Sequence, residues 1–430
     1  MDLAGIAVQY YWPPLVNSSR CACRGWATKR CSVTNICEGW WAASCQSVCA
    51  EGAISFANGK SVIDETICIR CGKCASACSY HAIAFIERPC QAACGMDAIG
   101  LDENGKARID YDRCVSCGPC LVSCPFRAIV DKSQIFPVVR SIADGTTVVA
   151  IVAPSFVGQF GKNVTVPKFV AAMKQLGFSD VVEVAAGADV CAIEEARDFV
   201  EKVPAQQKFL ATSCCPSWRM MARRLFPDES GNISMTYTPM IYTARLVKHT
   251  HPGSKVVFIG PCAAKKLEAM QQELRSDVDF VLTYEELMGI FEAKAIDFSQ
   301  LPDTDDLHDA SGLGRGFAAA GGVAAAVEEV LRRTQPDMEV KIQRADGLRE
   351  CRRLLTLAKA GKFDGYLLEG MACPGGCVAG AGTIIPAEAA KKQLDAHAKQ
   401  ATVFSCAESP YRAFAGLLEE PAAREEETKR

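Results

Sequence analysis

Five cysteines in three short motifs have the side-chain type and the spacing that could bind an iron–sulfur cluster. Cys214 and Cys215 lie in the run Thr-Ser-Cys-Cys-Pro-Ser-Trp, Cys262 lies in Gly-Pro-Cys-Ala-Ala-Lys-Lys, and Cys373 and Cys377 lie in Ala-Cys-Pro-Gly-Gly-Cys. Each motif follows a short apolar run that is typical of a buried strand. If these strands share one sheet, their ends bring the five thiols to one cleft. A 4Fe–4S cluster takes four thiolates, so one thiol remains for chemistry.

Cysteine is the most unusual feature of the composition. The chain contains 24 cysteines, and most of them lie within residues 21–124, many at Cys-x2-Cys spacing. A secreted disulfide scaffold would be short and would spread its cysteines through loops, so this clustering favours thiolate–metal binding in a reducing compartment. The five histidines form no paired ligand pattern, which argues against a His-rich zinc or non-haem iron site.

The pattern Cys-x3-Cys-x3-Ala-Ile occurs four times before residue 130. It is the half-unit of a bacterial-type ferredoxin, in which Ala-Ile starts a short strand. There a Cys-x2-Cys-x2-Cys-x3-Cys run gives three thiolates to one cluster and the fourth to another. Two half-units are complete, and they consist of Cys68, Cys71, Cys74 and Cys78, and of Cys114, Cys117, Cys120 and Cys124.

The fourth ligand of each cluster depends on which half-units pair. If the complete runs pair with each other, Cys78 and Cys124 are exchanged between their clusters. A nested pairing instead brings in Cys49 and Cys94. In either case we expect two 4Fe–4S clusters, which carry single electrons.

Residues 21–49 contain a cluster motif with one ligand missing. Cys37 is followed at the usual spacing by Trp40, and Cys45 comes next. Tryptophan cannot ligate iron, so either a third cluster is absent here or another thiol completes it, from Cys21, Cys23 or Cys31. The additional candidate ligands in the N-terminal third are Cys37, Cys45, Cys49, Cys90 and Cys94.

The composition changes near residue 136 to an ordinary α/β pattern. We expect an α+β ferredoxin-like N-terminal cluster domain, followed by an α/β catalytic domain with parallel sheets flanking the active-site cofactor. The expected division is an irregular Cys-rich segment (1–60), a ferredoxin-like 4Fe–4S domain (61–135), a catalytic domain (136–418) and a disordered charged tail (419–430).

Strand-like and helix-like runs alternate within the catalytic domain. Strands are expected over 147–152, 180–184, 208–211, 256–259, 280–282, 340–343 and 364–368. Helices are expected over 167–176, 193–203, 218–225, 321–333 and 347–360, with another beginning at 284.

Charge and hydropathy exclude several classes of partner. The net charge of −3 gives no bias toward nucleic acid or anionic membranes. No run of apolar residues is long enough to span a membrane, and no basic segment followed by an apolar core indicates a secretory signal. We therefore expect a cytoplasmic location.

The three cysteine motifs, preceded by the ferredoxin repeats, resemble the signature of iron–iron (FeFe) hydrogenases. The resemblance implies an H-cluster, a 4Fe–4S cubane joined through one cysteine to a two-iron subsite that carries carbonyl, cyanide and a bridging dithiolate amine. Carried over by position, the cubane ligands are Cys215, Cys262, Cys373 and Cys377, and Cys377 is the bridging thiolate.

The resemblance also assigns roles around this cofactor. Cys214 is the spare thiol that passes protons to the bridging amine, which suits a group that gains and loses a proton. Lys265 is the ammonium that pairs with a cyanide ligand. The remaining pocket residues are Ala153, Pro154 and Ser155 at a strand end, Met371 against the diiron subsite, and Phe317.

A proton path from Cys214 follows from the same resemblance. Its members are Glu195, Ser234 and Asp198, of which Asp198 stands where the family has a second glutamate. Glu195 and Asp198 are three residues apart and share one helix face. The competing interpretation of these two carboxylates is a solvated acidic surface.

Several positions depart from the family pattern. Ser217 replaces a usual glycine, Gly260 replaces a methionine, and Met240 replaces a glutamine, while residues 380–383 read Gly-Ala-Gly-Thr. These departures indicate a divergent branch. The family branch that the chain resembles is the monomeric, ferredoxin-linked one with N-terminal ferredoxin repeats.

The implied function is reversible oxidation of dihydrogen in an anaerobic cytoplasm. Ferredoxin is the expected electron partner, and maturation proteins are expected to make the diiron subsite. Two alternatives remain. One is a non-catalytic iron–sulfur assembly protein, and the other is a hydrogen sensor or bifurcating subunit. Retention of Cys214 favours the enzyme over the assembly protein. The isolated cysteines Cys191, Cys351 and Cys406 are expected to be buried small hydrophobes.

Overall fold

The computed structural model describes residues 15–25, 29–271, 273–303, 307 and 310–417. The expected disordered tail at 419–430 lies outside these residues. The chain forms two compact units. The cysteine-rich unit comprises Ser18–Asp110 and Cys120–Val130, and the large unit includes Tyr111–Pro119 and the chain from Asp131 onward. This division differs from the domain limits expected from the sequence.

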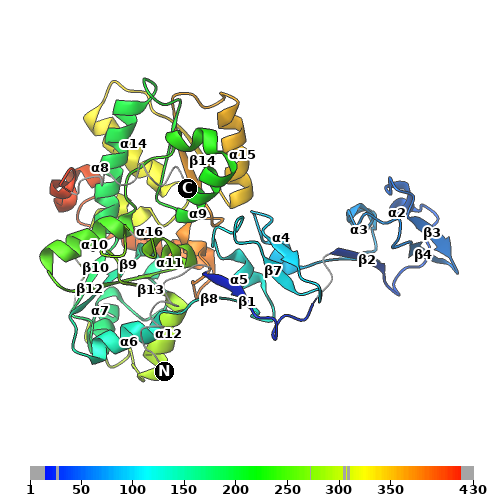
Figure 1. Cartoon of the computed structure of the whole chain (residues 1–430), viewed down its shortest axis with the longest axis horizontal. Helices are drawn as coiled ribbons and strands as arrows, with labels where there is room; N and C mark the ends of the chain where they lie inside the picture. The colour runs from blue at the N-terminus through cyan, green and yellow to red at the C-terminus, as the bar shows by residue number, and fades with distance from the viewer. Residues whose placement is uncertain (1–14, 26–28, 272, 304–306, 308–309, 418–430) are drawn as a thin grey trace. The chain divides into compact units, whose positions relative to one another are not determined.

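The large unit contains two parallel sheets, as expected. The first has the order β10 (Asp180–Glu183), β9 (Val148–Val152), β12 (Lys255–Gly260) and β13 (Phe280–Thr283), visible side by side in Figure 1. The central strand β9 is buried along its whole length, because helices cover both faces of a parallel sheet.

The second sheet has three parallel strands. Its order is β11 (Leu210–Ala211), β15 (Tyr366–Met371) and β14 (Lys341–Asp346). The sequence analysis considered that the cysteine-bearing strands share one sheet. They do not, because β12 belongs to the first sheet while β11 and β15 belong to the second. The apolar runs of the sequence specify buried strands but carry no information about which strands pair.

Every expected helix is present, but one begins much earlier than predicted. The structure also contains helices that the sequence analysis did not expect, the longest of which are α10 (Pro239–Thr250) and α16 (Ala387–Lys399). The helix expected over 193–203 is α8 (Ala185–Lys202), which begins eight residues earlier. Its first half, Ala-Ala-Gly-Ala-Asp-Val-Cys-Ala, is buried on all sides and so lacks an amphipathic period. Gly187 permits the close approach of a neighbouring helix, since a Cβ there would lie 2.3 Å from the Pro239 carbonyl oxygen.

The other helices of the large unit surround these sheets. They are α6 (Ile135–Ala143), α7 (Val166–Leu176), α9 (Pro216–Leu225), α10 (Pro239–Thr250), α11 (Ala263–Ala269), α12 (Tyr284–Ala293), α13 (Gly312–Gly316), α14 (Gly322–Thr334), α15 (Leu348–Lys359) and α16 (Ala387–Lys399). α12 begins with a capping box between Thr283 and Glu286, the pattern that fixes a helix start.

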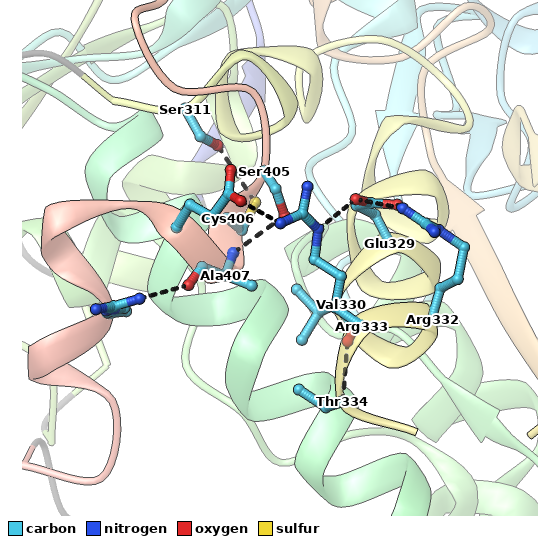
Figure 2. A network of polar contacts seen from close by, with 11 residues as sticks. Ser311, Glu329, Val330, Arg332, Arg333, Thr334, Ser405, Cys406 and Ala407 are labelled. Carbon is cyan, nitrogen blue, oxygen red and sulfur yellow. Dashed lines mark hydrogen bonds and ion pairs between the residues drawn. The ribbon is translucent and has the colours of Figure 1, made fainter. Parts of the chain in front are cut away.

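The C-terminal segment is tied to the large unit by an ionic network (Figure 2). Arg333 of α14 pairs with Glu329 of the same helix and with Glu408 of the short 3-10 helix η4 (Cys406–Glu408). The hydroxyl of Ser311 lies 3.4 Å from the Cys406 sulfur. Cys191, Cys351 and Cys406 are all fully buried, as expected.

In the cysteine-rich unit, short antiparallel pairs alternate with single helical turns. β2 (Lys29–Val33) pairs with β5 (Ile83–Glu87), β3 (Ile54–Ala57) with β4 (Lys60–Ile63), and β6 (Ile99–Leu101) with β7 (Ala107–Ile109). All four Ala-Ile repeats start a strand at the isoleucine, the fourth being β8 (Ile129–Asp131). The helical turns are α2 (Ser44–Ser47), α3 (Lys73–Ala77), α4 (Pro89–Ala92) and α5 (Pro119–Ser123).

The four repeats share one further detail. In each, the alanine N–H lies 3.3 or 3.4 Å from the sulfur of the cysteine four residues earlier. Such N–H groups stabilise a thiolate. Within the described residues, no helix is long and apolar enough to cross a membrane.

Candidate active site

Five thiols from three chain segments line one cavity in the large unit. Cys214 and Cys215 follow β11, Cys262 follows β12, and Cys373 and Cys377 follow β15. The carboxyl ends of parallel strands lie at one edge of a sheet, and both sheets direct such edges to this cavity. The structure therefore brings together the five cysteines that the sequence predicted to meet, although from two sheets rather than one.

The strand-to-helix turn at Cys215 is fixed by Trp218. The fully buried indole donates a hydrogen bond from Nε1 to the Thr212 carbonyl oxygen at 2.9 Å. Its ring packs on Gly370 of β15, where a Cβ would lie only 2.2 Å from a ring carbon. Glycine at this position therefore allows the segments that carry Cys215 and Met371 to lie close together.

The four expected cubane ligands have pKa values above that of an ordinary thiol. Desolvation is the largest cause, and it raises the pKa of Cys262 to about 11 and that of Cys377 to about 12. Negative charges at the neighbouring cysteines raise the pKa of Cys373 further. Four thiolates at this spacing need cations to offset their repulsion. The donor set thus fits an iron–sulfur cluster, whose binding would release the thiol protons.

A lone metal ion and a cuboid cluster differ in how closely they draw their ligands together. Within the described part of the chain, no group of three or more His, Cys, Asp or Glu side chains is close enough to hold one metal ion. A cuboid cluster attaches each thiolate to a different iron, so its ligands lie farther apart.

Cys214 lines the same cavity, and Ser213, which precedes it, donates its backbone N–H to Glu195 Oε1 at 3.0 Å. Desolvation raises the pKa of the Cys214 thiol well above its ordinary value, and the negative charge of Glu195 is the next cause. Both effects keep the proton on sulfur at neutral pH. A protonated thiol can hold and pass a proton.

Glu195 of α8 is a fully buried carboxyl. Its Oε1 accepts the backbone N–H of Ser213 at 3.0 Å, and its Oε2 has no hydrogen-bond partner among the described residues. Desolvation raises the pKa of Glu195 to about 7, with a further increase from Asp198, while the Ser213 N–H acts in the opposite direction. A carboxyl that titrates near neutrality is well suited to proton transfer.

The other two expected path residues lie near Glu195 without touching it. Ser234 Oγ accepts the backbone N–H of Thr236 at 3.1 Å. Asp198 pairs with Lys202 one turn along α8 at 2.8 Å. In the described structure no direct hydrogen bond joins Glu195, Ser234 and Asp198, so a relay through all three requires bridging water.

Lys265 places its ammonium at the cavity wall. Its Nζ donates to Glu268 Oε2 at 2.6 Å and to the Cys214 carbonyl oxygen at 3.4 Å. An ammonium has three N–H donors, so one remains for an anionic ligand in the cavity.

The remaining wall is apolar. Ala153, Pro154, Met371 and Phe317 line it as predicted, whereas Ser155 is not among the lining residues. The Ser155 hydroxyl instead lies 2.8 Å from the Tyr284 hydroxyl, behind the wall.

Phe258 is a wall residue that sequence reasoning missed. It lies on β12 beside Gly260, where a Cβ would lie 2.5 Å from the Phe258 ring. Phe258 reads as an ordinary core residue of a strand, so the sequence gives no signal that its ring reaches the cavity.

Cys117 also lines this cavity. It belongs to the second complete ferredoxin-type run, and its negative charge is one cause of the raised pKa of Cys373. Ser217, next to the cavity, donates its hydroxyl to the Val115 carbonyl oxygen at 2.9 Å. The segment 114–117 is therefore attached to the turn that carries Cys215.

Most thiols of the cysteine-rich unit line three separate cavities. One is lined by Cys31, Cys49, Cys68, Cys71 and Cys74, a second by Cys37, Cys45 and Cys78, and a third by Cys23, Cys90 and Cys124. Cys49, rather than Cys124, lies with the run that starts at Cys68, as the nested pairing predicts for that run. The place of Cys94 in the nested pairing stays a prediction. Hydrogen bonds from the backbone lower the pKa of Cys37, led by the N–H of Ser61.

Comparison with known proteins identifies the family. Residues 146–381, more than half of the chain, match the family model described as "Iron only hydrogenase large subunit, C-terminal domain". The chain belongs to this iron-only hydrogenase family. Residues 67–128 match a 4Fe–4S dicluster domain, so the chain is also an iron–sulfur protein.

Two curated hydrogenases are similar to this family member. The periplasmic Fe hydrogenase large subunit of Nitratidesulfovibrio vulgaris is 31% identical over 51% of this chain and 63% of its own length. Iron hydrogenase 1 of Clostridium pasteurianum is 30% identical over 74% of this chain and 64% of its own length. The chain thus spans less than two thirds of these relatives.

The chain is also similar to proteins with other names. Cytosolic iron–sulfur assembly component 3 of Bos taurus is 26% identical over 55% of this chain and 60% of its own length. An apo FeFe-hydrogenase HydA1 variant from Chlamydomonas reinhardtii shares the fold, with a TM-score of 0.53 and 21% identity over 69% of this chain and 97% of that one.

Proposed function

We propose that this chain catalyses the reversible oxidation of dihydrogen to two protons and two electrons. The observation that carries the proposal is the position of Cys214. It directly follows Ser213, whose backbone N–H binds the buried carboxyl of Glu195 at 3.0 Å, and it opens onto a cavity lined by four further cysteines that fit a cluster. A bound H-cluster would supply the metal centre at which dihydrogen is split.

The ligands of the proposed cofactor are the four cysteines of this cavity. Cys215, Cys262, Cys373 and Cys377 would hold the cubane, and Cys377 would bridge to the diiron subsite. Lys265 would donate to an anionic cyanide ligand from its position between Glu268 and the Cys214 carbonyl. The apolar wall excludes water, which strengthens this charge-assisted contact.

Proton transfer is assigned to Cys214 and Glu195. The Cys214 thiol carries the proton at the cavity, and Glu195 exchanges it. Because Glu195 has a pKa of about 7, it gives up or accepts a proton near neutral pH at little cost. Ser234 and Asp198 would continue the path through water.

Electron transfer is assigned to the ferredoxin-type runs. The position of Cys117 at the cavity supports a cluster of the second run as the immediate electron partner of the active site. We propose ferredoxin as the external carrier, maturation proteins as the source of the diiron subsite, and an anaerobic cytoplasmic setting.

Infrared spectroscopy of anaerobic protein matured with the diiron cofactor tests this function. We expect sharp bands in the region of metal-bound carbonyl and cyanide stretches, and we expect them to shift under dihydrogen. Bound iron and sulfide without such bands would contradict the proposal.

The similarity to iron–sulfur assembly proteins supports one alternative, a non-catalytic assembly factor. Such a protein would bind a cubane at the four cysteines but no diiron subsite. The two functions differ in their need for Cys214. An assembly factor would keep its ability to support cluster delivery after Cys214→Ala, whereas the hydrogenase would lose turnover.

A further inference from the structure

Residues 37–49 keep the backbone of a cluster-binding run although one cysteine is replaced. Gly39 and Arg70, each two residues after a cysteine, both have positive φ, at 62° and 58°. Ala43 and Gly72 also have positive φ, and each is the N-cap of a short helix, α2 and α3 respectively. The incomplete run therefore repeats the turns of the complete one.

This backbone match assigns each cysteine of the incomplete run a counterpart in the complete run. Cys37 corresponds to Cys68, Cys45 to Cys74, and Cys49 to Cys78. Trp40 takes the place of Cys71, and two extra residues, Trp41 and Ala42, follow it.

The two runs exchange their last cysteines. Cys49 of the incomplete run lines the cavity of Cys68, Cys71 and Cys74. Cys78 of the complete run lines the cavity of Cys37 and Cys45. This reciprocal exchange is the arrangement by which paired half-units build two clusters. The Cys37 cavity is thus built as a cluster site with three thiols.

Ser61 orients two of these thiols. This buried residue donates its backbone N–H to the Cys37 sulfur at 3.4 Å, and its hydroxyl lies 3.2 Å from the Cys45 sulfur. A hydroxyl that contacts a ligand sulfur supports that thiolate by hydrogen bonding, so Ser61 is not needed as a ligand.

Trp40 closes the place where the fourth thiolate would lie. Its ring lines the cavity and stacks on Tyr80, with ring centroids 4.0 Å apart and planes inclined by 8°. The indole of Trp40 cannot ligate iron, because its nitrogen is a hydrogen-bond donor only. Trp40 therefore covers one corner of the cavity without supplying a bond.

We propose that Cys37, Cys45 and Cys78 hold a 3Fe–4S cluster, with Trp40 against the corner that lacks iron. A cuboid cluster with one iron removed needs three thiolates and leaves the missing corner without a ligand. This proposal goes beyond dihydrogen chemistry and stands independently of it, because the site lies within the cysteine-rich unit.

Electron paramagnetic resonance tests the site in full-length protein produced without maturation proteins and purified anaerobically. Oxidised 4Fe–4S clusters are diamagnetic, whereas an oxidised 3Fe–4S cluster has an unpaired electron. We expect one 3Fe–4S signal per chain in mildly oxidised wild-type protein and its loss in C37A and C45A.

The decisive variant restores the missing ligand. Trp40→Cys completes the four-thiolate set, so we expect the 3Fe–4S signal to disappear and the iron content to rise by about one atom per chain. Trp41→Cys is the matched control. It adds the same thiol one residue away, at a fully exposed position, and should leave both signal and iron content unchanged.

Three results would overturn the proposal. The first is wild-type protein without a 3Fe–4S signal. The second is a signal that survives in C37A and C45A, which would place the cluster in another cavity. The third is W40C protein with the spectrum and iron content of W41C. If C37A and C45A fail to accumulate, the comparison of W40C with W41C decides alone.

Discussion

The hydroxyl of Ser217 donates to the carbonyl oxygen of Val115 at 2.9 Å, and both residues are buried. Ser217 stands in the turn that carries Cys215, and Val115 stands between Cys114 and Cys117. Arg224, farther along α9, also donates to the Cys114 carbonyl oxygen at 2.8 Å. Ser217 and Arg224 thus attach this cysteine run to the segment that carries Cys215.

Removing this hydroxyl should loosen the cysteine run. We expect Ser217→Ala to leave the Val115 carbonyl without this donor and to lower the free energy of unfolding by about 1–3 kcal/mol. Hydrogen exchange at residues 114–117 should accelerate more than elsewhere in the large unit. Ser299→Ala is the control, because its hydroxyl makes an exposed local contact with Asp297. Equal exchange rates at residues 114–117 in S217A and S299A would show that the Ser217 hydrogen bond does not stabilise this segment.

The close approach of Trp218 and Gly370 predicts a steric effect on the site. Gly370→Ala places a Cβ within 2.2 Å of the indole, so we expect a loss of about 1–3 kcal/mol in unfolding free energy and a lower iron content. Gly289→Ala is the matched control on α12, where a Cβ meets no atom within 4 Å. That variant should gain up to about 1 kcal/mol from helix propensity. A G370A protein as stable as G289A would contradict the packing described.

The buried carboxyl of Glu195 should make the stability of the metal-free protein depend on pH. Its pKa is 4.5 for an ordinary glutamate and about 7 in the fold. Between these values the folded state retains a proton that the unfolded state has lost, so stability falls as pH rises from 4.5 to 7 and stays low above.

Glu195→Gln removes this titration. We expect the variant to match wild type near pH 4 and to be more stable by about 3 kcal/mol at pH 8, measured by denaturant unfolding of metal-free protein. Glu194→Gln is a control on the same helix, with a carboxylate near the surface. The stability difference between E195Q and wild type should therefore change between pH 4 and pH 8. If this difference is constant over that range, Glu195 does not titrate there.

Removing the Cys214 thiol should nearly abolish turnover without affecting cofactor binding. In matured protein we expect Cys214→Ala to retain its iron and its infrared bands while dihydrogen evolution falls by about 100-fold or more, the size of a general acid–base contribution. Cys406→Ser is the control, since this buried thiol contacts Ser311 away from the cavity. Turnover within a few fold of wild type in C214A would rule out its role in proton transfer.

The sequence alone predicted that this chain is an iron–sulfur protein. Cysteine spacing specified which thiols belong to cluster motifs, and apolar runs specified the strands that carry Cys214, Cys262 and Cys373. Both signals are local, because a cluster-binding loop and a buried strand are each defined by a few consecutive residues. The alternation of strands and helices likewise predicted the parallel sheets.

Tertiary structure decided what depends on residues far apart in the chain. It placed the cysteine-bearing strands in two sheets, brought Phe258 and Cys117 to the cavity, and joined Cys49 rather than Cys124 to the run at Cys68. Strand order and half-unit pairing are set by packing between distant segments, and identical local patterns are compatible with several such pairings. The pKa of Glu195 likewise depends on burial by elements that its own helix does not specify.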